Sequence, residues 1–302
     1  MSLIEITDYD ANGWRDKNDI KNRAANYCEM LEAGNVLFFN GVPFDLPEEN
    51  RDFLLSQRQT ESAFHKNISY RPKKDILRGT SGKNDAERMR EVMKYYSSEV
   101  TRFISDFLAP YKGKLDLDFA SFRPLEEKGR NLPLKKRNDL LHVDSFPTRP
   151  TKGARILRVF TNINPTEPRI WNVAEPFEIL AERYAEKAGL EKFSVKKSSG
   201  VSRFFNQMGL PVADHSAYDK FMLHFHDYLK GNEYFQANCD KQRLEFPPNT
   251  TWMVYTDGVP HAALSGQYAL EQTYIVPVET LVAKAKAPIS ILETICNRKL
   301  SV

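Results

Sequence analysis

The sequence predicts an α+β protein that is mainly β, and two observations support this. Apolar residues in the first third have helical spacing, whereas from about residue 115 short apolar segments alternate with turns that contain Pro and Gly. Short strands separated by such turns favour two packed sheets over a βαβ repeat. The predicted fold is therefore a double-stranded β-helix (jelly roll) core with N-terminal and inserted helices.

The spacing of apolar residues also predicts the individual elements. Helices are expected over about 16–32 and 85–108, the second with an apolar stripe that we assign to core packing. An apolar run at 36–39, closed by Asn40-Gly41, predicts a buried strand. Later strands are expected at 115–122, 140–144, 154–164, 243–246, 251–255, 261–264 and 272–278, with helices at 176–188 and 214–231.

Length and composition indicate one compound globular domain over 1–302. A helical part, about 1–112, would pack on a jelly-roll core of about 113–280, followed by a C-terminal helix at about 286–298. The chain is 41% hydrophobic and 27% charged, which excludes a disordered protein. The net charge of +3 is too small to indicate nucleic acid, so no nucleic-acid partner is expected.

The cysteines and the N-terminal residues indicate the cellular compartment in which the protein is expected. Cys28, Cys239 and Cys296 are odd in number and widely spaced, so they form neither a disulfide framework nor a zinc motif and favour a reducing compartment. The first residues lack the pattern of a signal peptide, and no window approaches the roughly 20 apolar residues that span a bilayer. We therefore expect a cytoplasmic protein whose membrane contact, if any, is peripheral.

The segment Leu141-His142-Val143-Asp144 is the main candidate for a metal site. On a strand, residues two apart project to the same face, so His142 and Asp144 can reach one ion. His261, at the start of a later predicted strand, supplies a third ligand. Two histidines and one carboxylate form the facial triad of non-heme Fe(II) oxygenases, which leaves open positions for a chelating cosubstrate and O2.

The motif alone is weak, because among 6 histidines and 40 acidic residues about one His-x-acid pair is expected by chance. His142 is the only histidine with a carboxylate two positions later. His224 and His226 lie two apart on a predicted helix and so point to different faces. We predict that these two are not ligands, and the same holds for His65 and His215.

The distal carboxylate of such a cosubstrate needs a cation. No basic residue lies between His261 and Lys284, so we look to the strand after the metal motif. There Arg158 lies among Leu, Val and Phe and must find an anion, because a buried guanidinium without one is costly. Arg158 is the candidate for the cosubstrate, a structural ion pair is the alternative, and Gln272 is a candidate neutral donor.

Three segments carry a family resemblance: HVDSFPTRPTKGARILRVFTNINPTEPRIWNV, DGVPHAALSGQYALEQTYIVP and FHKNISYRP. They resemble the Kdo hydroxylases, which oxygenate the 3-deoxy-octulosonic acid (Kdo) of lipopolysaccharide. The resemblance implies hydroxylation at C3 of Kdo in Kdo-lipid A, giving Ko, with Fe(II), 2-oxoglutarate and O2. It also implies a possible peripheral contact with the inner membrane. Two alternatives remain: another jelly-roll metalloenzyme, or a catalytically inactive module that binds sugar acids.

The stretch before the metal motif is basic and suits an anionic substrate. Its basic residues are Arg123, Lys128, Arg130, Lys135, Lys136 and Arg137. The same stretch has only two acidic residues, Glu126 and Glu127. The excess of positive charge indicates either one wall of the substrate entrance or a solvated loop. Arg123 is the best candidate for substrate binding, and Lys66 is a weaker one. Trp171 either lines the substrate site or belongs to the core.

Overall fold

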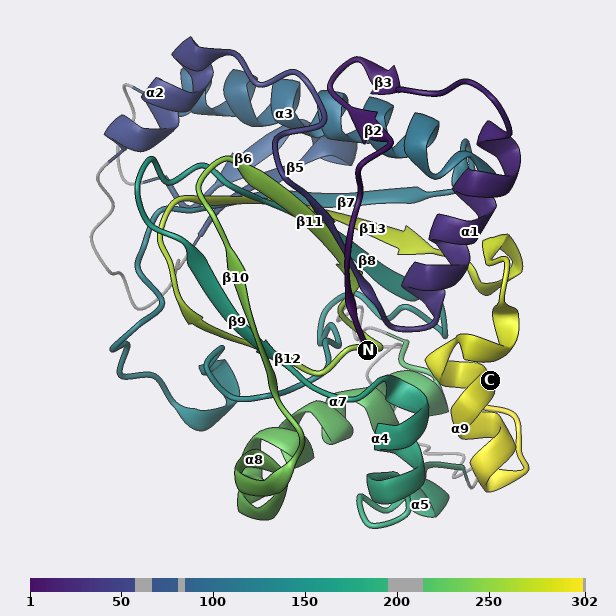
Figure 1. The fold of residues 1–302 in the computed structure, drawn as a ribbon. Helices are drawn as coiled ribbons and strands as arrows, with labels where there is room; N and C mark the ends of the chain where they lie inside the picture. The colour runs from purple at the N-terminus through teal and green to yellow at the C-terminus, as the bar shows by residue number, and fades with distance from the viewer. Residues whose placement is uncertain (58–66, 81–84, 195–213, 301–302) are drawn as a thin grey trace.

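The computed structural model describes residues 1–57, 67–80, 85–194 and 214–300. Within these residues, eight strands form a large sheet in the order β1–β4–β11–β8–β13–β7–β5–β6 (Figure 1). Neighbouring strands are antiparallel except β1 and β4, which are parallel. The bounds are β1 Leu3–Glu5, β4 Val36–Phe39, β5 Ile68–Arg71, β6 Ile76–Arg78, β7 Asp116–Arg123, β8 Arg155–Asn162, β11 Thr250–Tyr255 and β13 Ala269–Val276.

A smaller antiparallel sheet covers one face of the large one (Figure 1). It contains β10 Gln242–Phe246, β9 Arg169–Val173 and β12 His261–Ser265. Aromatic rings fill the space between the two sheets, and Phe246 stacks on Trp252 with ring centroids 3.9 Å apart. Because the opposite face is covered by helices, β8 and β11 are buried almost throughout, including polar residues such as Arg155, Thr161 and Thr251.

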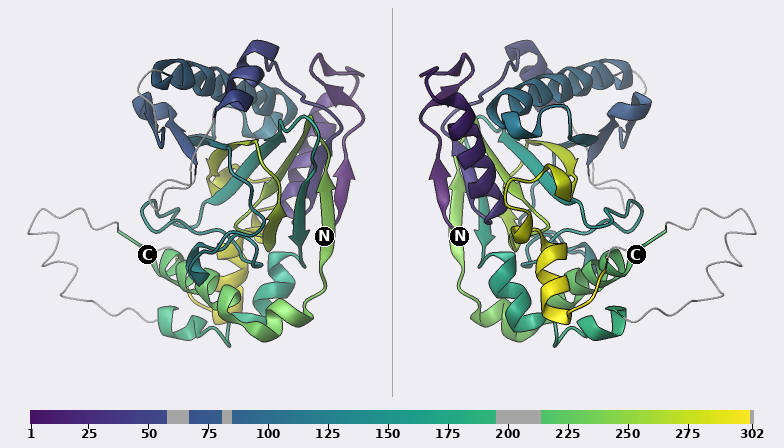
Figure 2. Two further views of the ribbon diagram at one scale, coloured as in Figure 1. Left: turned by 90° about the vertical axis from the view of Figure 1, so that its left-hand side faces the viewer. Right: turned by 90° about the vertical axis from the view of Figure 1, so that its right-hand side faces the viewer.

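Most helices lie at two ends of the molecule, with the strands between them, whereas α1 runs beside the strands (Figure 2). Their bounds are α1 Ile20–Glu32, α2 Glu48–Ser56, α3 Ala86–Phe107, α4 Phe177–Tyr184, α5 Leu190–Ser194, α7 Ala217–Gly231, α8 Glu233–Asn238 and α9 Pro288–Cys296. Short 3-10 turns occur at Pro72–Lys74, Ala109–Tyr111, Leu134–Lys136, Val278–Thr280 and Lys284–Lys286. None of the helices in the described residues combines the length and the apolar character that crossing a bilayer requires.

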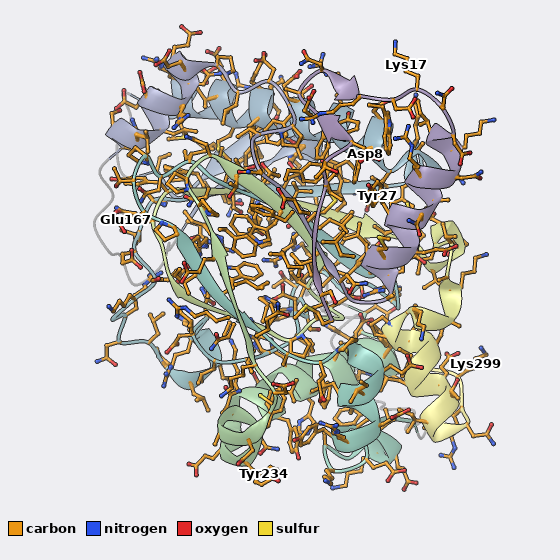
Figure 3. The ribbon with its side chains drawn as sticks, viewed as in Figure 1. Asp8, Lys17, Tyr27, Glu167, Tyr234 and Lys299 are labelled. Carbon is orange, nitrogen blue, oxygen red and sulfur yellow. The ribbon has the colours of Figure 1, made fainter. Side chains whose placement is uncertain are left out.

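The N-terminal segment is fastened to the helices that cover the large sheet. It forms a small hairpin of β2 Tyr9–Asp10 and β3 Gly13–Trp14. The Tyr27 hydroxyl on α1 donates a hydrogen bond to the Asp8 carboxylate at 2.8 Å, and both side chains are labelled in Figure 3. The predicted stripe of α3 is buried as core: Met89, Val92, Met93, Tyr96, Val100, Phe103, Ile104 and Phe107.

Most predicted elements are confirmed to within a few residues, and the mixed α/β composition is confirmed with them. The strand predicted at 140–144 is wrong: this segment forms one isolated bridge, between His142 and His261, and no ladder. The sequence interpretation missed β9, whose polar and charged residues hide its pattern. It also missed the edge strands β1 and β6 and the neighbouring β5, which are only three or four residues long.

Candidate metal centre

His142, Asp144 and His261 lie together between the two sheets. One donor atom from each can be chosen so that all three lie within 4.8 Å of one another. His142 Nε2 is 3.8 Å from Asp144 Oδ1, and His261 Nε2 is 3.8 Å from Asp144 Oδ2. Divalent transition-metal ions bind nitrogen and oxygen donors at about 2.0–2.2 Å, so small movements of these side chains suffice for one ion to bind all three.

The backbone sets the tautomer of both histidines. His142 Nδ1 lies 2.7 Å from the carbonyl oxygen of Leu140, and His261 Nδ1 lies 2.9 Å from that of Val259. A carbonyl only accepts, so each Nδ1 donates and each Nε2 keeps its lone pair for a metal. Burial lowers the pKa of both imidazoles, which keeps them in the neutral form that binds a cation.

Asp144 is held as a carboxylate. Burial alone would raise the pKa of this carboxyl, but the Arg158 guanidinium, the two imidazoles and a hydrogen bond from Thr256 together hold the pKa below its ordinary value. Arg158 Nη2 lies 3.2 Å from Asp144 Oδ2, which is ion-pair distance. Nevertheless, Oδ2 is buried and has no hydrogen-bond partner. A carboxylate that faces one imidazole nitrogen with each oxygen, and whose Oδ2 has no hydrogen-bond donor, fits a bound cation.

Backbone hydrogen bonds to two other segments bring the ligands together, although no regular strand carries His142. Its amide and carbonyl pair with those of His261 at 3.2 and 3.0 Å, which joins the first ligand to the start of β12. The Asp144 amide donates to the carbonyl oxygen of Thr256 at 2.8 Å, just after β11. His142 and Asp144 thus face the same site, as predicted for two residues of a strand, but contacts with two other segments hold them there.

Trp171 lies directly against the metal ligands. Its ring stacks on His261, with centroids 5.2 Å apart and planes at 22°. It also packs edge-on against Phe160 and Trp252 in the aromatic layer between the sheets. The structure therefore places Trp171 in the core, in contact with the metal ligand His261, and its role in substrate binding stays a prediction. Its buried indole nitrogen has no hydrogen-bond partner.

Arg158 and Arg123 share one carboxylate beside the triad. Arg158 Nη1 lies 3.0 Å from Glu271, and Arg123 Nε donates to the same carboxylate at 2.9 Å. Arg123 also lies 3.7 Å from Glu127 and is only 15% exposed, so it is no part of a solvated loop. The Nε of Arg158 is buried without an acceptor among the described residues. Both predicted cations are therefore next to the metal site.

Sequence reasoning missed the acidic partners of these arginines. Glu127 is 6% exposed and lies within 3.7 Å of guanidinium nitrogens from Arg123, Arg130 and Arg169. Arg169, itself 1% exposed, reaches this carboxylate from β9. The only signal in the sequence was that Glu126 and Glu127 interrupt a basic run, and that signal does not indicate which arginine they meet.

Two other predicted residues are not brought to the site. Strand β13 pairs Thr273 with Arg158, and paired residues project to the same face of the sheet. Because successive residues alternate, Gln272 points to the face opposite Arg158. The Gln272 amide nitrogen donates to the carbonyl oxygens of Thr273 and Asp118 at 2.9 and 3.2 Å. The proposed role of Gln272 as a donor to the cosubstrate therefore finds no support in this geometry. Lys66 lies outside the described residues.

His226 lies closer to the triad than expected. Its ring centroid is 4.8 Å from that of His142, and its Nδ1 is 2.9 Å from the carbonyl oxygen of Val143. The donor group found among the described residues nevertheless comprises only His142, Asp144 and His261. Two imidazoles and one carboxylate define the class of mononuclear non-heme Fe(II) oxygenases.

Comparisons with known proteins identify the family within that class. The family model for 3-deoxy-D-manno-oct-2-ulosonic acid (Kdo) hydroxylase matches residues 14–299. A crystal structure of the Kdo hydroxylase KdoO with α-ketoglutarate (2-oxoglutarate) and Fe(III) is 34% identical, with a TM-score of 0.83 over 99% of this chain and 97% of that one. The apo form is also 34% identical, with a TM-score of 0.86 over 100% and 98%.

A third crystal structure, of KdoO with succinate and Fe(III), is again 34% identical, with a TM-score of 0.82 over 99% and 97%. The search of curated proteins found no match. The chain belongs to the Kdo hydroxylase family, and it is an Fe(II)- and 2-oxoglutarate-dependent dioxygenase.

Proposed function

We propose that the chain hydroxylates Kdo at C3 in Kdo-lipid A, giving Ko, and that His142, Asp144 and His261 hold the Fe(II). One atom of O2 enters a C–H bond of the sugar, and the other enters succinate as 2-oxoglutarate loses CO2. The observation that carries the proposal is a donor set of two neutral imidazoles and one carboxylate beside a buried guanidinium. When bound, the iron supplies the activation of O2, which no side chain provides.

Arg158 is the proposed partner of the distal carboxylate of 2-oxoglutarate. Its guanidinium has five donors, of which one nitrogen faces Glu271 and another faces Asp144. The buried Nε still lacks an acceptor, and a buried donor left this way costs about 1–3 kcal/mol. A carboxylate that accepts from Arg158 would remove this cost and lie beside the metal ligand Asp144.

Arg123 and Trp171 are the proposed substrate-binding residues. Arg123 offers a positive charge near Arg158 for the carboxylate of Kdo. Trp171 offers a flat apolar face, together with an indole N–H that has no partner in the structure. Both residues lie on strands, which position side chains more rigidly than loops do. Lys66 stays a candidate on the sequence argument alone.

We further propose that the chain is one compound domain built on a jelly roll. Antiparallel strands of the large sheet face the three-stranded sheet across a shared aromatic layer, and the metal ligands lie at one end of that layer. The N-terminal helices α1 and α3 share a hydrophobic core with the large sheet. A helical part and a β part with a common core are expected to unfold together.

Kdo-lipid A is a membrane lipid, so we propose a peripheral contact with the inner membrane. Leu134 is 48% exposed beside the exposed Lys135 and Lys136, and Tyr234 on α8 is 70% exposed (Figure 3). Leu134 lies against Gly231 at the end of α7, which leads directly into α8. Exposed apolar side chains next to basic ones are typical of surfaces that bind anionic lipids.

We propose that this contact is made from the cytoplasm. The three cysteines, Cys28, Cys239 and Cys296, are all free thiols, as expected in a reducing compartment. Co-sedimentation with anionic vesicles tests the membrane contact, and a variant with Leu134→Asp and Tyr234→Ser should bind them less. Equal binding by this variant would place the lipid contact elsewhere.

Succinate release tests the activity itself. We expect the full rate of release from 2-oxoglutarate to require Fe(II), O2 and Kdo-lipid A together, with only slow uncoupled release without the lipid, and we expect the lipid to gain one oxygen atom that comes from 18O2. NMR of the product locates the new hydroxyl group, and a hydroxyl at another carbon would correct the regiochemistry. Binding of Kdo-lipid A without any succinate would favour the inactive binding module instead.

A further inference from the structure

A row of alternating guanidinium and phenyl groups leads away from Arg158. The Phe146 ring centroid lies 5.6 Å from Arg158 Cζ and 4.1 Å from Arg149 Cζ. The Phe119 ring centroid lies 3.9 Å from Arg149 Cζ and 4.7 Å from Arg71 Cζ. Each phenyl ring thus contacts two cations, and Arg149 contacts both rings.

The row is assembled from segments that are far apart in the sequence. Arg71 ends β5, Phe119 lies on β7 and Arg158 lies on β8, while Phe146 and Arg149 follow the metal ligand Asp144 in the chain. Because β7 pairs with β5 and β13 pairs with both β7 and β8, the row crosses the large sheet. One end lies at Arg158 beside the triad, and the other lies at Arg71 in the outer part of the sheet.

The outer part of this row has more positive than negative charge. Asp118 forms an ion pair with Arg149, and it is the one carboxylate found paired with either Arg149 or Arg71 among the described residues. Burial lowers the pKa of Arg149 in spite of that pair, so Asp118 does not fully offset the desolvation of the guanidinium. The Nε of Arg71 is buried without a hydrogen-bond acceptor.

Arg149 is also open to a ligand. Its side chain is 33% exposed, in contrast with 12% for Arg158 and 1% for Arg155, both on β8. Packing between two phenyl rings fixes the plane of the guanidinium and leaves its N–H edge for an acceptor. A fixed guanidinium can bind a carboxylate or a phosphate through two parallel hydrogen bonds.

We propose that Arg149, supported by Arg71, binds a second anionic group of the substrate, at a distance from the sugar that is oxidised. This inference rests on the proposed function, because the substrate must carry more than one acid group. The ligand is an oxyanion, either the carboxylate of a neighbouring sugar acid or a phosphate of the lipid headgroup. Arg158 at one end of the row serves the cosubstrate, and Arg149 orients the rest of the substrate.

Steady-state kinetics of Arg149→Gln and Arg149→Lys test this role. With intact Kdo-lipid A carrying two Kdo groups and two phosphates, Arg149→Gln should raise the KM about 10- to 100-fold, as expected for a lost charge-assisted contact. The kcat and the KM for 2-oxoglutarate should stay unchanged. Arg149→Lys should recover only part of the loss, because an ammonium group lacks the planar fork. Arg183→Gln, which removes an exposed arginine paired with Glu175, is the matched control.

Two altered substrates distinguish the sources of the anion. If a phosphate is bound, the penalty of Arg149→Gln should vanish with dephosphorylated Kdo-lipid A. If a sugar carboxylate is bound, it should vanish with the form that carries a single Kdo. An equal penalty for all three substrates, a raised KM for 2-oxoglutarate, or no penalty at all would overturn the inference.

Direct binding separates this inference from the proposed function. Kdo-lipid A in detergent should bind Arg149→Gln about 10- to 100-fold more weakly than the wild type in an equilibrium titration. A wild type that binds but releases no succinate would contradict the activity and leave the anion site standing. Equal binding by wild type and Arg149→Gln would refute the anion site whatever the turnover. Phe119→Leu, which frees one face of Arg149, should give a smaller loss of the same kind.

Discussion

Two buried arginine–aspartate pairs begin on the same strand, three residues apart, and their surroundings differ. Arg155 and Asp257 are 1% and 2% exposed, and neither leaves a buried polar atom without a partner among the described residues. Arg158 and Asp144 are 12% and 13% exposed, and both leave a buried atom without a hydrogen-bond partner. The first pair is complete and needs no bound molecule or ion. The second is incomplete, because Asp144 Oδ2 has room for a cation as partner and Arg158 Nε for an anion.

The complete pair serves the site indirectly. Arg155 Nε donates to Asp257 at 3.1 Å, and its guanidinium lies 4.0 Å from the Tyr255 ring centroid. Asp257 begins the turn that leads to the metal ligand His261. A Cβ at the following Gly258 would collide with Arg155, so the turn and the guanidinium are fitted closely. This pair therefore fixes the backbone that presents one ligand, while the Arg158 pair contacts the ligands themselves.

The largest expected effect comes from breaking the complete pair. Arg155→Ala should lower the free energy of unfolding by about 3–5 kcal/mol, because Asp257 would remain as a buried, unpaired carboxylate. Urea unfolding measures this loss. Arg158→Ala is the comparison and should cost less in the iron-loaded protein, because the metal still compensates Asp144 and Arg123 still compensates Glu271. Equal losses would mean that both pairs are structural.

A second test concerns function at the incomplete pair. Arg158→Ala should raise the apparent KM for 2-oxoglutarate roughly 30- to 1000-fold, which corresponds to about 2–4 kcal/mol for a bidentate charge-assisted contact. The KM for Kdo-lipid A should change far less. An unchanged KM for 2-oxoglutarate would transfer the role to another cation and make Arg158 a structural residue.

The comparison also separates what the sequence could predict from what it could not. The apolar and β-branched residues of β8 and β11 predicted strands, and the order His142, Asp144, His261 predicted the donor set. Glu271 and Glu127 were missed because ion pairs between strands are set by tertiary packing, which leaves no local pattern. The strand predicted at 140–144 failed because contacts with two other segments, rather than a ladder, hold that loop extended.

A smaller effect is expected at Arg123, whose charge is shared between two carboxylates. Arg123→Ala should lower kcat/KM for Kdo-lipid A about tenfold without changing uncoupled consumption of 2-oxoglutarate. Capture of the anionic substrate by the wild type should weaken as salt rises, since charges are screened over about 10 Å at 0.1 M. Activity that is indifferent to both the substitution and salt would leave Arg123 with a structural role only.

The most direct test of the central claim is the iron content of matched histidine variants. After anaerobic reconstitution with Fe(II) and removal of free metal, the wild type, His224→Ala and His226→Ala should each retain about one iron per chain, whereas His142→Ala, Asp144→Ala and His261→Ala should retain almost none. Circular dichroism should confirm that all variants are folded. Retention of iron by His261→Ala together with its loss from His226→Ala would contradict the assignment of the triad.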